Sequence, residues 1–233
     1  MTKCPVYLQN KCVLSSFVGS EKLSDVFHVP LKIIQTRKSC EGDTQKCLYS
    51  PYVEPIVKQP YSTKVTIHKV ENPYKVKADI LIYPTNNVLT IDDPLLHRMS
   101  RGLIQKELDA FSKPIKMGQV YVTGNGGNSS LVQSKKIFHT IVAGESRLVN
   151  EEDIKTATRK ALMLADNGEN LNVLMIPADC GTHDINDVAR VQLAAIKTYL
   201  QSNKNCSIKN IFVVMEDQES IDTFNEYFKR IFK

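Results

Sequence analysis

The sequence lacks several features that would place it in a special class of protein. It has no apolar run near about 18 residues, the length typical of a membrane-spanning helix. Its first residues, MTKCPVYLQNKC, contain no apolar segment of signal-peptide length, and the chain has no low-complexity tract and no internal repeat. We therefore expect an intracellular protein, cytoplasmic or nuclear, with reduced cysteines and no membrane contact.

Closely spaced cysteine pairs are also missing. Cys4, Cys12, Cys40 and Cys47 form two pairs with seven and six residues between partners. Structural zinc sites usually separate paired ligands by about two to four residues. We predict that these four cysteines do not form a zinc site, and we expect no metal and no cofactor. Buried thiols are the favoured interpretation over a looser metal site that would include His28.

Neither sign of charge dominates the sequence. It has 30 basic and 25 acidic residues, which give a formal net charge of +5. This excess permits binding to a polyanion without requiring it, and a solvated surface is the simpler interpretation. Lys135 and Lys136 would serve a single-stranded nucleic acid, but aromatic residues are not interleaved with a basic stripe along the sequence.

What the sequence does contain changes in character near residue 62. In residues 1–62, strand-like and loop-like pieces alternate without a clear period, and prolines cluster at Pro51, Pro55 and Pro60. We interpret this part as an N-terminal extension that packs on the rest of the chain or binds a protein partner. Residues 63–233 have a regular pattern and are long enough to bury a core, so we predict one domain there.

The regular part alternates strand patterns with helix patterns. We predict strands at 65–70, 78–84, 118–124, 136–143, 171–178 and 208–216. Apolar residues at three-and-four spacing predict helices at 94–111, from about 151, from about 184 and at the C-terminus. This order predicts an α/β fold, a three-layer helix–sheet–helix sandwich with a mixed, mostly parallel sheet.

Ligands of such sheets bind beyond the carboxyl ends of the strands. This rule selects the loops that follow Pro84, Val122 and Ala178. We expect these loops to converge on one site, with Asp92, Asp93 and Asp184 nearby. The candidate ligand-binding residues are Asn86, Asn87, Gly124, Gly126, Gly127, Asn128, Cys180, Gly181 and Thr182.

The same three loops resemble those of a macro domain, the family that binds ADP-ribose. The stretch ADILIYPTNN resembles the family's strand and first ligand loop. GQVYVTGNGGN and KKIFHTIVA resemble the family's paired strands. VLMIPADCGTHDINDVARVQLAAIKTYL resembles the family's strand, second ligand loop and helix. The resemblance runs from about Thr63 to Lys233. It implies the macro-domain fold, binding of ADP-ribose or a related nucleotide and, in an active member, removal of ADP-ribose from a substrate.

The resemblance also implies roles for single residues. Asn86 matches the asparagine that faces the distal ribose and orients it in hydrolytic members, Asp79 matches a structural acid, and His139 matches a packed strand histidine. His183 is a second weak catalytic candidate, because a histidine beside Asp184 could act as a base near neutral pH. The simpler alternatives are that the asparagine shapes a turn and that the histidine belongs to a helix cap.

Two departures from the family pattern bear on function. The first loop reads VLTIDDP where the family has a run of glycines, and the second, DCGTHDIND, keeps a single glycine. Aspartates near a diphosphate oppose it by about 1 kcal/mol at a screened distance of about 4 Å. Two interpretations therefore stay open. The domain is an atypical, weak nucleotide binder, or it has lost nucleotide binding and serves as a structural subunit or as a module for single-stranded nucleic acid or protein.

Overall fold

The computed structural model describes residues 7–8, 11–12, 61–113, 115–144, 149–178 and 184–232. The chain divides into two units, Met1–Lys58 and Gln59–Lys233. In the first unit the described residues are the two short antiparallel strands β1 (Tyr7–Leu8) and β2 (Lys11–Cys12).

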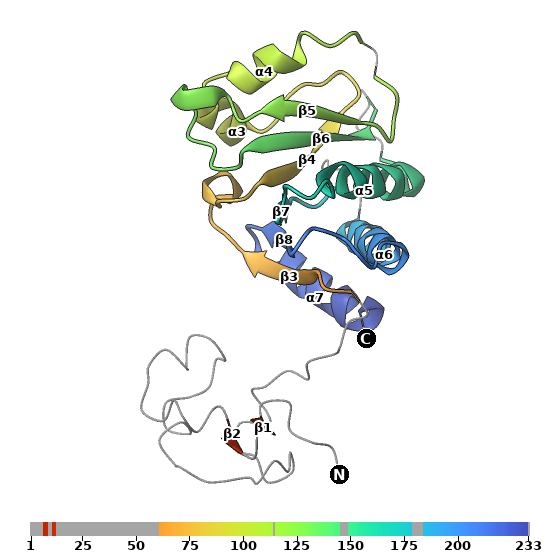
Figure 1. Ribbon diagram of the computed structural model, residues 1–233. Helices are drawn as coiled ribbons and strands as arrows, with labels where there is room; N and C mark the ends of the chain where they lie inside the picture. Colours follow the sequence, from red (N-terminus) through yellow and green to blue (C-terminus); the bar gives the residue numbers. More distant parts are fainter. Residues whose placement is uncertain are drawn as a thin grey trace. The chain divides into compact units, whose positions relative to one another are not determined.

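The second unit is built on a six-stranded sheet (Figure 1). Its spatial order is β3 (Lys64–Lys69), β8 (Asn210–Met215), β7 (Asn172–Met175), β4 (Ile80–Asn86), β6 (Lys136–Ala143) and β5 (Val120–Gly124). Neighbouring strands are parallel except β5, which runs antiparallel to β6. The predicted mixed, mostly parallel sheet is therefore confirmed, and the strand predicted at 65–70 is β3, which lies at one edge of the sheet.

Helices cover both faces of the sheet. One face carries α5 (Glu151–Ala165), α6 (Ile185–Ser202) and α7 (Gln218–Ile231), whose buried stripes pack on Ile80, Ile82 and Ile211. The other face carries the shorter helices α3 (Pro94–Met99) and α4 (Leu103–Leu108). The α/β three-layer architecture is thus the predicted one. No described helix is long and apolar enough to cross a membrane.

The single helix predicted for residues 94–111 is wrong. The backbone turns left-handed at Arg101 (φ 53°) and Gly102 (φ 71°), which ends α3 and starts α4 in a new direction. The amide of Gly102 donates to the carbonyl of His97 at 2.9 Å and closes the first helix. Glycine tolerates this backbone because it has no Cβ, and this local preference overrides the continuous apolar spacing.

Candidate functional site

The parallel strands end at a common edge of the sheet, which we call the carboxyl edge. Asn86 is the last residue of β4, and the amide of Asn87 donates to the carbonyl of Ala143 at the end of β6, at 2.9 Å. The carbonyl of Asn87 in turn accepts from the amide of Ile115 at 3.1 Å. The paired asparagines therefore lie where ligands of α/β sheets bind.

The side chain of Asn86 is committed to its own loop. Its amide nitrogen donates to Oδ2 of Asp92 at 3.1 Å, and its Oδ1 accepts from the backbone amides of Val88 and Thr90 at 3.2 and 3.1 Å. The residue is buried, with 8% of its surface exposed. In this structure Asn86 thus shapes the turn that follows β4, the simpler of the two roles considered for it.

Asn87 has the opposite character. Its Oδ1 is a buried atom without a hydrogen-bond partner among the described residues. Buried polar atoms are nearly always paired, so an unpaired acceptor at a ligand-side edge is notable. Lys116, which follows the hydrogen-bonded Ile115, brings a cation to the same edge. The sequence reasoning missed this lysine, because the residues before β5 carry no motif.

Carboxylates occupy the starts of two helices at this edge. Asp93 is the N-cap of α3: its Oδ1 accepts from the amides of Leu95 and Leu96, at 2.7 and 3.2 Å, and its Oδ2 accepts from the hydroxyl of Tyr74. Asp184 is the N-cap of α6 and accepts from the amide of Asn186 at 2.9 Å. Helix N-termini attract anions, and here the protein's own carboxylates take those positions.

The predicted convergence of all three loops is wrong for Gly124, Gly126, Gly127 and Asn128. Because β5 is antiparallel, Gly124 pairs with Lys136 at the start of β6, whereas Asn86 pairs with Ala143 at its end. At about 3.3 Å per residue the two ends of β6 are roughly 20 Å apart. These four residues therefore lie at the opposite edge, which we call the amino edge. There the amide of Gly124 donates to Oε2 of Glu107 at 2.8 Å.

The loop that carries Cys180, Gly181, Thr182 and His183 lies outside the described residues, so their proximity to Asn87 stays a prediction. The same holds for Cys4, Cys40, Cys47 and His28, and only the backbone of Cys12 is described. Within the described part of the chain, no three His, Cys, Asp or Glu side chains gather as a metal site.

Two residues matched by the resemblance, His139 and Asp79, make contacts that stabilise the fold. His139 is fully buried, and its Nε2 lies 2.9 Å from the hydroxyl of Thr123; burial lowers its pKa to about 3. Asp79 accepts from the amides of Leu171 and Asn172 and pairs with Lys135 at 2.6 Å. Burial works to raise the pKa of Asp79, but these hydrogen bonds outweigh it and the net shift is downward. Both residues hold strands together.

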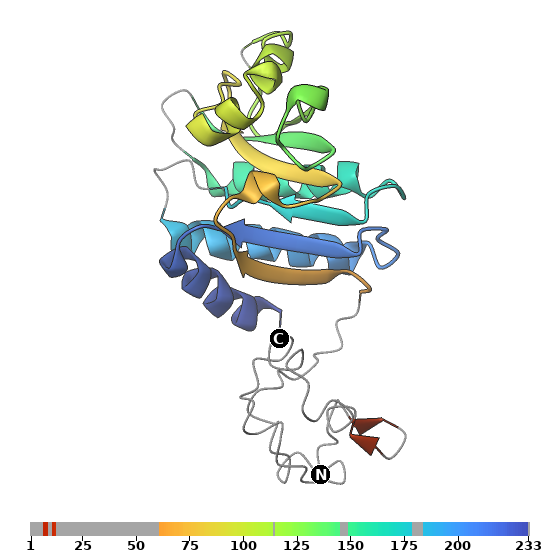
Figure 2. The same cartoon turned by 90° about the vertical axis from the view of Figure 1, so that its left-hand side faces the viewer.

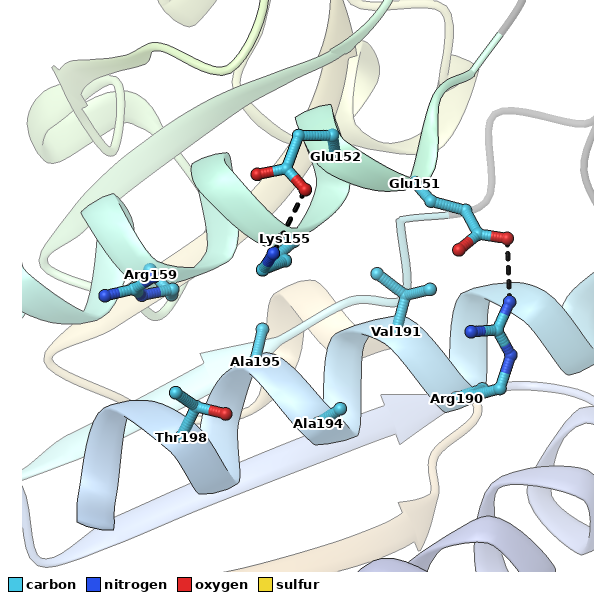
Figure 3. A pocket seen from close by; sticks show the side chains of 9 residues that line it. All are labelled: Glu151, Glu152, Lys155, Arg159, Arg190, Val191, Ala194, Ala195 and Thr198. Carbon is cyan, nitrogen blue, oxygen red and sulfur yellow. Dashed lines mark hydrogen bonds and ion pairs between the residues drawn. The ribbon is translucent and has the colours of Figure 1, made fainter. Parts of the chain in front are cut away.

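A cavity of about 280 Å³ opens elsewhere, between α5 and α6 (Figure 3). Two of its three cations, Lys155 and Arg190, are paired with Glu152 and Glu151, at 3.0 and 2.7 Å. The remaining lining residues are Arg159, Val191, Ala194, Ala195 and Thr198. None of the asparagines at the carboxyl edge lines this cavity. The cavity therefore does not coincide with the candidate site.

Comparison with known proteins identifies the fold. Histone macroH2A1.1 of Capsaspora owczarzaki is 25% identical over 176 residues, which are 70% of this chain and 48% of that protein. The chain thus spans about half the length of this curated relative. No protein-family model matches the chain.

Solved structures agree with this likeness. A mutant macrodomain of Oceanobacillus iheyensis, solved with ADPR, superposes with a TM-score of 0.58 at 17% identity, covering 72% of this chain and 94% of that one. The macro domain of ganglioside induced differentiation associated protein 2 gives 0.59 at 16% identity, covering 76% and 91%. The chain therefore has the macro-domain fold.

Proposed function

We propose that the carboxyl edge is an atypical, weak site for ADP-ribose or a related nucleotide. The observation that carries this proposal is the buried Oδ1 of Asn87 beside the end of β6, which has no hydrogen-bond partner among the described residues. A ribose hydroxyl or a purine amino group would donate to this oxygen and remove the cost of leaving it unpaired, which is about 1–3 kcal/mol. The relative solved with ADPR supports this ligand class, because it shares the fold.

The same site explains why binding is expected to be weak. A diphosphate placed here would meet Asp93 and Asp184 at helix starts whose amides already have carboxylate acceptors. Lys116, an exposed cation at this edge, would offset part of the repulsion. The domain therefore keeps the position of a nucleotide site. Its own carboxylates, however, already accept from the helix-start amides that would otherwise bind an anion.

Hydrolysis is not part of the proposal. Removal of ADP-ribose needs a group that orients the ribose or a water, and the matching Asn86 has both ends of its side chain engaged by Asp92, Val88 and Thr90. Re-aiming it would break these hydrogen bonds, at about 1 kcal/mol each. We propose a binding module.

An NMR titration of the ¹⁵N-labelled full chain with ADP-ribose tests the location. The expected result is a saturating shift of the amides of Asn87, Lys116 and Gly144, with α7 amides such as that of Asp222 unmoved. Inorganic phosphate, which lacks the ribose, should move them less. Absence of any shift up to about 1 mM ligand, or shifts confined to the cavity between α5 and α6, would show that this edge has lost nucleotide binding.

A further inference from the structure

Toward β3 and β8, one face of the sheet has no α-helix among the described residues. The short 3-10 helix η3 (Pro73–Lys75) lies on this side, and its Tyr74 shares a buried cluster with Leu174 and Val214. In β3 and β8, Val65, Ile67 and Ile211 pack toward α5–α7, so the alternate residues point to the other side. On that side α3 and α4 pack over β4 and β6, and no described α-helix lies in front of β3 and β8 (Figure 2). We call this surface the open face; its residues are Thr66 and His68 of β3, Asn210 and Phe212 of β8 and Asn172 of β7.

An aromatic pair lies on the open face. The rings of His68 and Phe212 have centroids 5.8 Å apart and are tilted by 51°. His68 is exposed and Phe212 half-buried, while Nε2 of His68 is held 2.8 Å from the hydroxyl of Thr66. Burial and the charge of Lys64 lower the pKa of His68, so the imidazole is uncharged near neutral pH. The two rings form a positioned, neutral surface on which a planar group can stack.

An amide pair lies next to the rings. Nδ2 of Asn210 donates to Oδ1 of Asn172 at 2.8 Å. This bond leaves Oδ1 of Asn210 as an acceptor and Nδ2 of Asn172 as a donor, neither with a protein partner in the described part of the chain. A donor and an acceptor side by side match the hydrogen-bonding edge of a nucleobase.

A row of exposed lysines borders the open face at the amino edge. Lys64 begins β3, Lys209 precedes β8, Lys77 precedes β4, and Lys135 and Lys136 lie at the start of β6. Of these five, Lys135 alone makes an ion pair within the described ranges, with Asp79. The strands from β3 to β6 are about 4.8 Å apart, so the row extends over roughly 20 Å. These lysines are scattered in sequence, and only the sheet brings them together.

We propose that the open face and this lysine row form a binding surface for single-stranded nucleic acid. The phosphates lie along the lysines, one or two bases stack on Phe212 and His68, and a base edge contacts Asn172 and Asn210. A duplex fits poorly, because its bases are stacked on one another and cannot reach the rings. The surface is independent of the proposed nucleotide site, which lies at the carboxyl edge.

Fluorescence anisotropy of the full chain with a labelled 12-nucleotide single strand, as RNA and as DNA, tests this surface. Phe212→Ala should weaken binding by about 5-fold or more, and Phe212→Tyr, which keeps a stacking ring, should restore it. Replacing Lys64 and Lys209 by glutamine should lower the slope of log affinity against log salt by about 0.7 for each contacting lysine. Lys229→Gln, an exposed lysine on α7, is the matched control and should change neither quantity.

Three outcomes would overturn the proposal. One is absence of binding to either strand at low salt. The second is binding of a duplex of the same length, or of heparin, as tightly as the single strand, which would indicate a polyanion surface without base contacts. The third is an affinity that Phe212→Ala leaves unchanged while its circular dichroism spectrum matches that of the wild type. A tighter complex with RNA than with DNA, or the reverse, would support the proposal and identify the strand it prefers.

Discussion

The side-chain amide of Asn86 donates to the carboxylate of Asp92 at 3.1 Å and so closes the loop after β4 on itself. The loop is fixed at both ends, because the next residue, Asp93, is the N-cap of α3. A glycine-rich loop would present backbone amides to a ligand. In this loop, the polar groups form hydrogen bonds with one another instead. We therefore expect the carboxyl edge to bind anions weakly.

Asn86→Ala should destabilise the domain. It removes three hydrogen bonds at a position that is 8% exposed and leaves the amides of Val88 and Thr90 without their acceptor. We expect the free energy of unfolding, measured in urea, to fall by about 1–3 kcal/mol. Asn128→Ala is the control: Asn128 is exposed and makes no side-chain hydrogen bond with the described residues, so its change should stay within about 0.5 kcal/mol. Equal stability of the two variants would refute the turn-shaping role.

His139 should make stability depend on pH. Its pKa is about 3 in the folded protein against 6.5 for an unburied histidine, so between these values the unfolded chain binds the extra proton. Stability is therefore complete above about pH 6.5 and is lost as the pH falls, by at most about 1.4 kcal/mol per pH unit. Urea denaturation between about pH 4.5 and 7 measures this slope, above the range in which most carboxylates titrate.

His139→Gln should flatten that slope, whereas His97→Gln, at an exposed position of α3, should keep it. His68, whose pKa is also lowered, is far more exposed and should leave only a small residual slope in the same direction. A variant lacking His139 that retains the full wild-type slope would show that another group is responsible.

Asp79 and Lys135 form an ion pair whose two members should differ in importance. Asp79→Ala leaves the amides of Leu171 and Asn172 without their acceptor at a buried position. It should lower the free energy of unfolding by about 2–4 kcal/mol. Lys135→Gln should cost less than about 1 kcal/mol, because the lysine side chain is 72% exposed. Equal losses in urea denaturation would mean that the ion pair, and not the backbone contacts, provides the stability.

The sequence pattern predicts most of the architecture because burial follows strand and helix periodicity closely. All residues of β4 are buried, as expected for a strand covered on both faces, and Asp93 and Asp184 cap their helices as their positions before Pro94 and Ile185 indicate. The break between α3 and α4 escapes prediction, because it depends on a left-handed backbone at Arg101 that no apolar spacing reveals.

The candidate site is less predictable, because it depends on the direction of each strand and on the hydrogen-bond partner of each polar side chain. The stretch 125–135 between β5 and β6 is shorter than the dozen or more residues that a parallel crossover usually takes, so the antiparallel pairing had a detectable signal. Nothing in the letters PTNN distinguishes Asn86, which binds its own loop, from Asn87, whose side-chain oxygen has no partner in the described part of the chain. That difference depends on the folded loop, in which Asp92, Val88 and Thr90 meet Asn86.

The central claim is that the protein's own carboxylates weaken a nucleotide site at the carboxyl edge. Calorimetric titration with ADP-ribose, of the wild type and of Asp92→Asn combined with Asp93→Asn, tests it most directly. Asparagine keeps an acceptor for Asn86 and is as good an N-cap as aspartate, so the double variant removes both charges and keeps these contacts, while the Tyr74 hydroxyl loses its carboxylate acceptor. Asp222→Asn on α7 is the control for net charge.

We predict a wild-type dissociation constant of about 100 µM or weaker. The double variant should bind about 5-fold or more tightly, with a larger gain at low salt than at high salt, and Asp222→Asn should leave affinity unchanged. Low-micromolar binding by the wild type, or a double variant whose affinity equals that of the wild type, would contradict the claim.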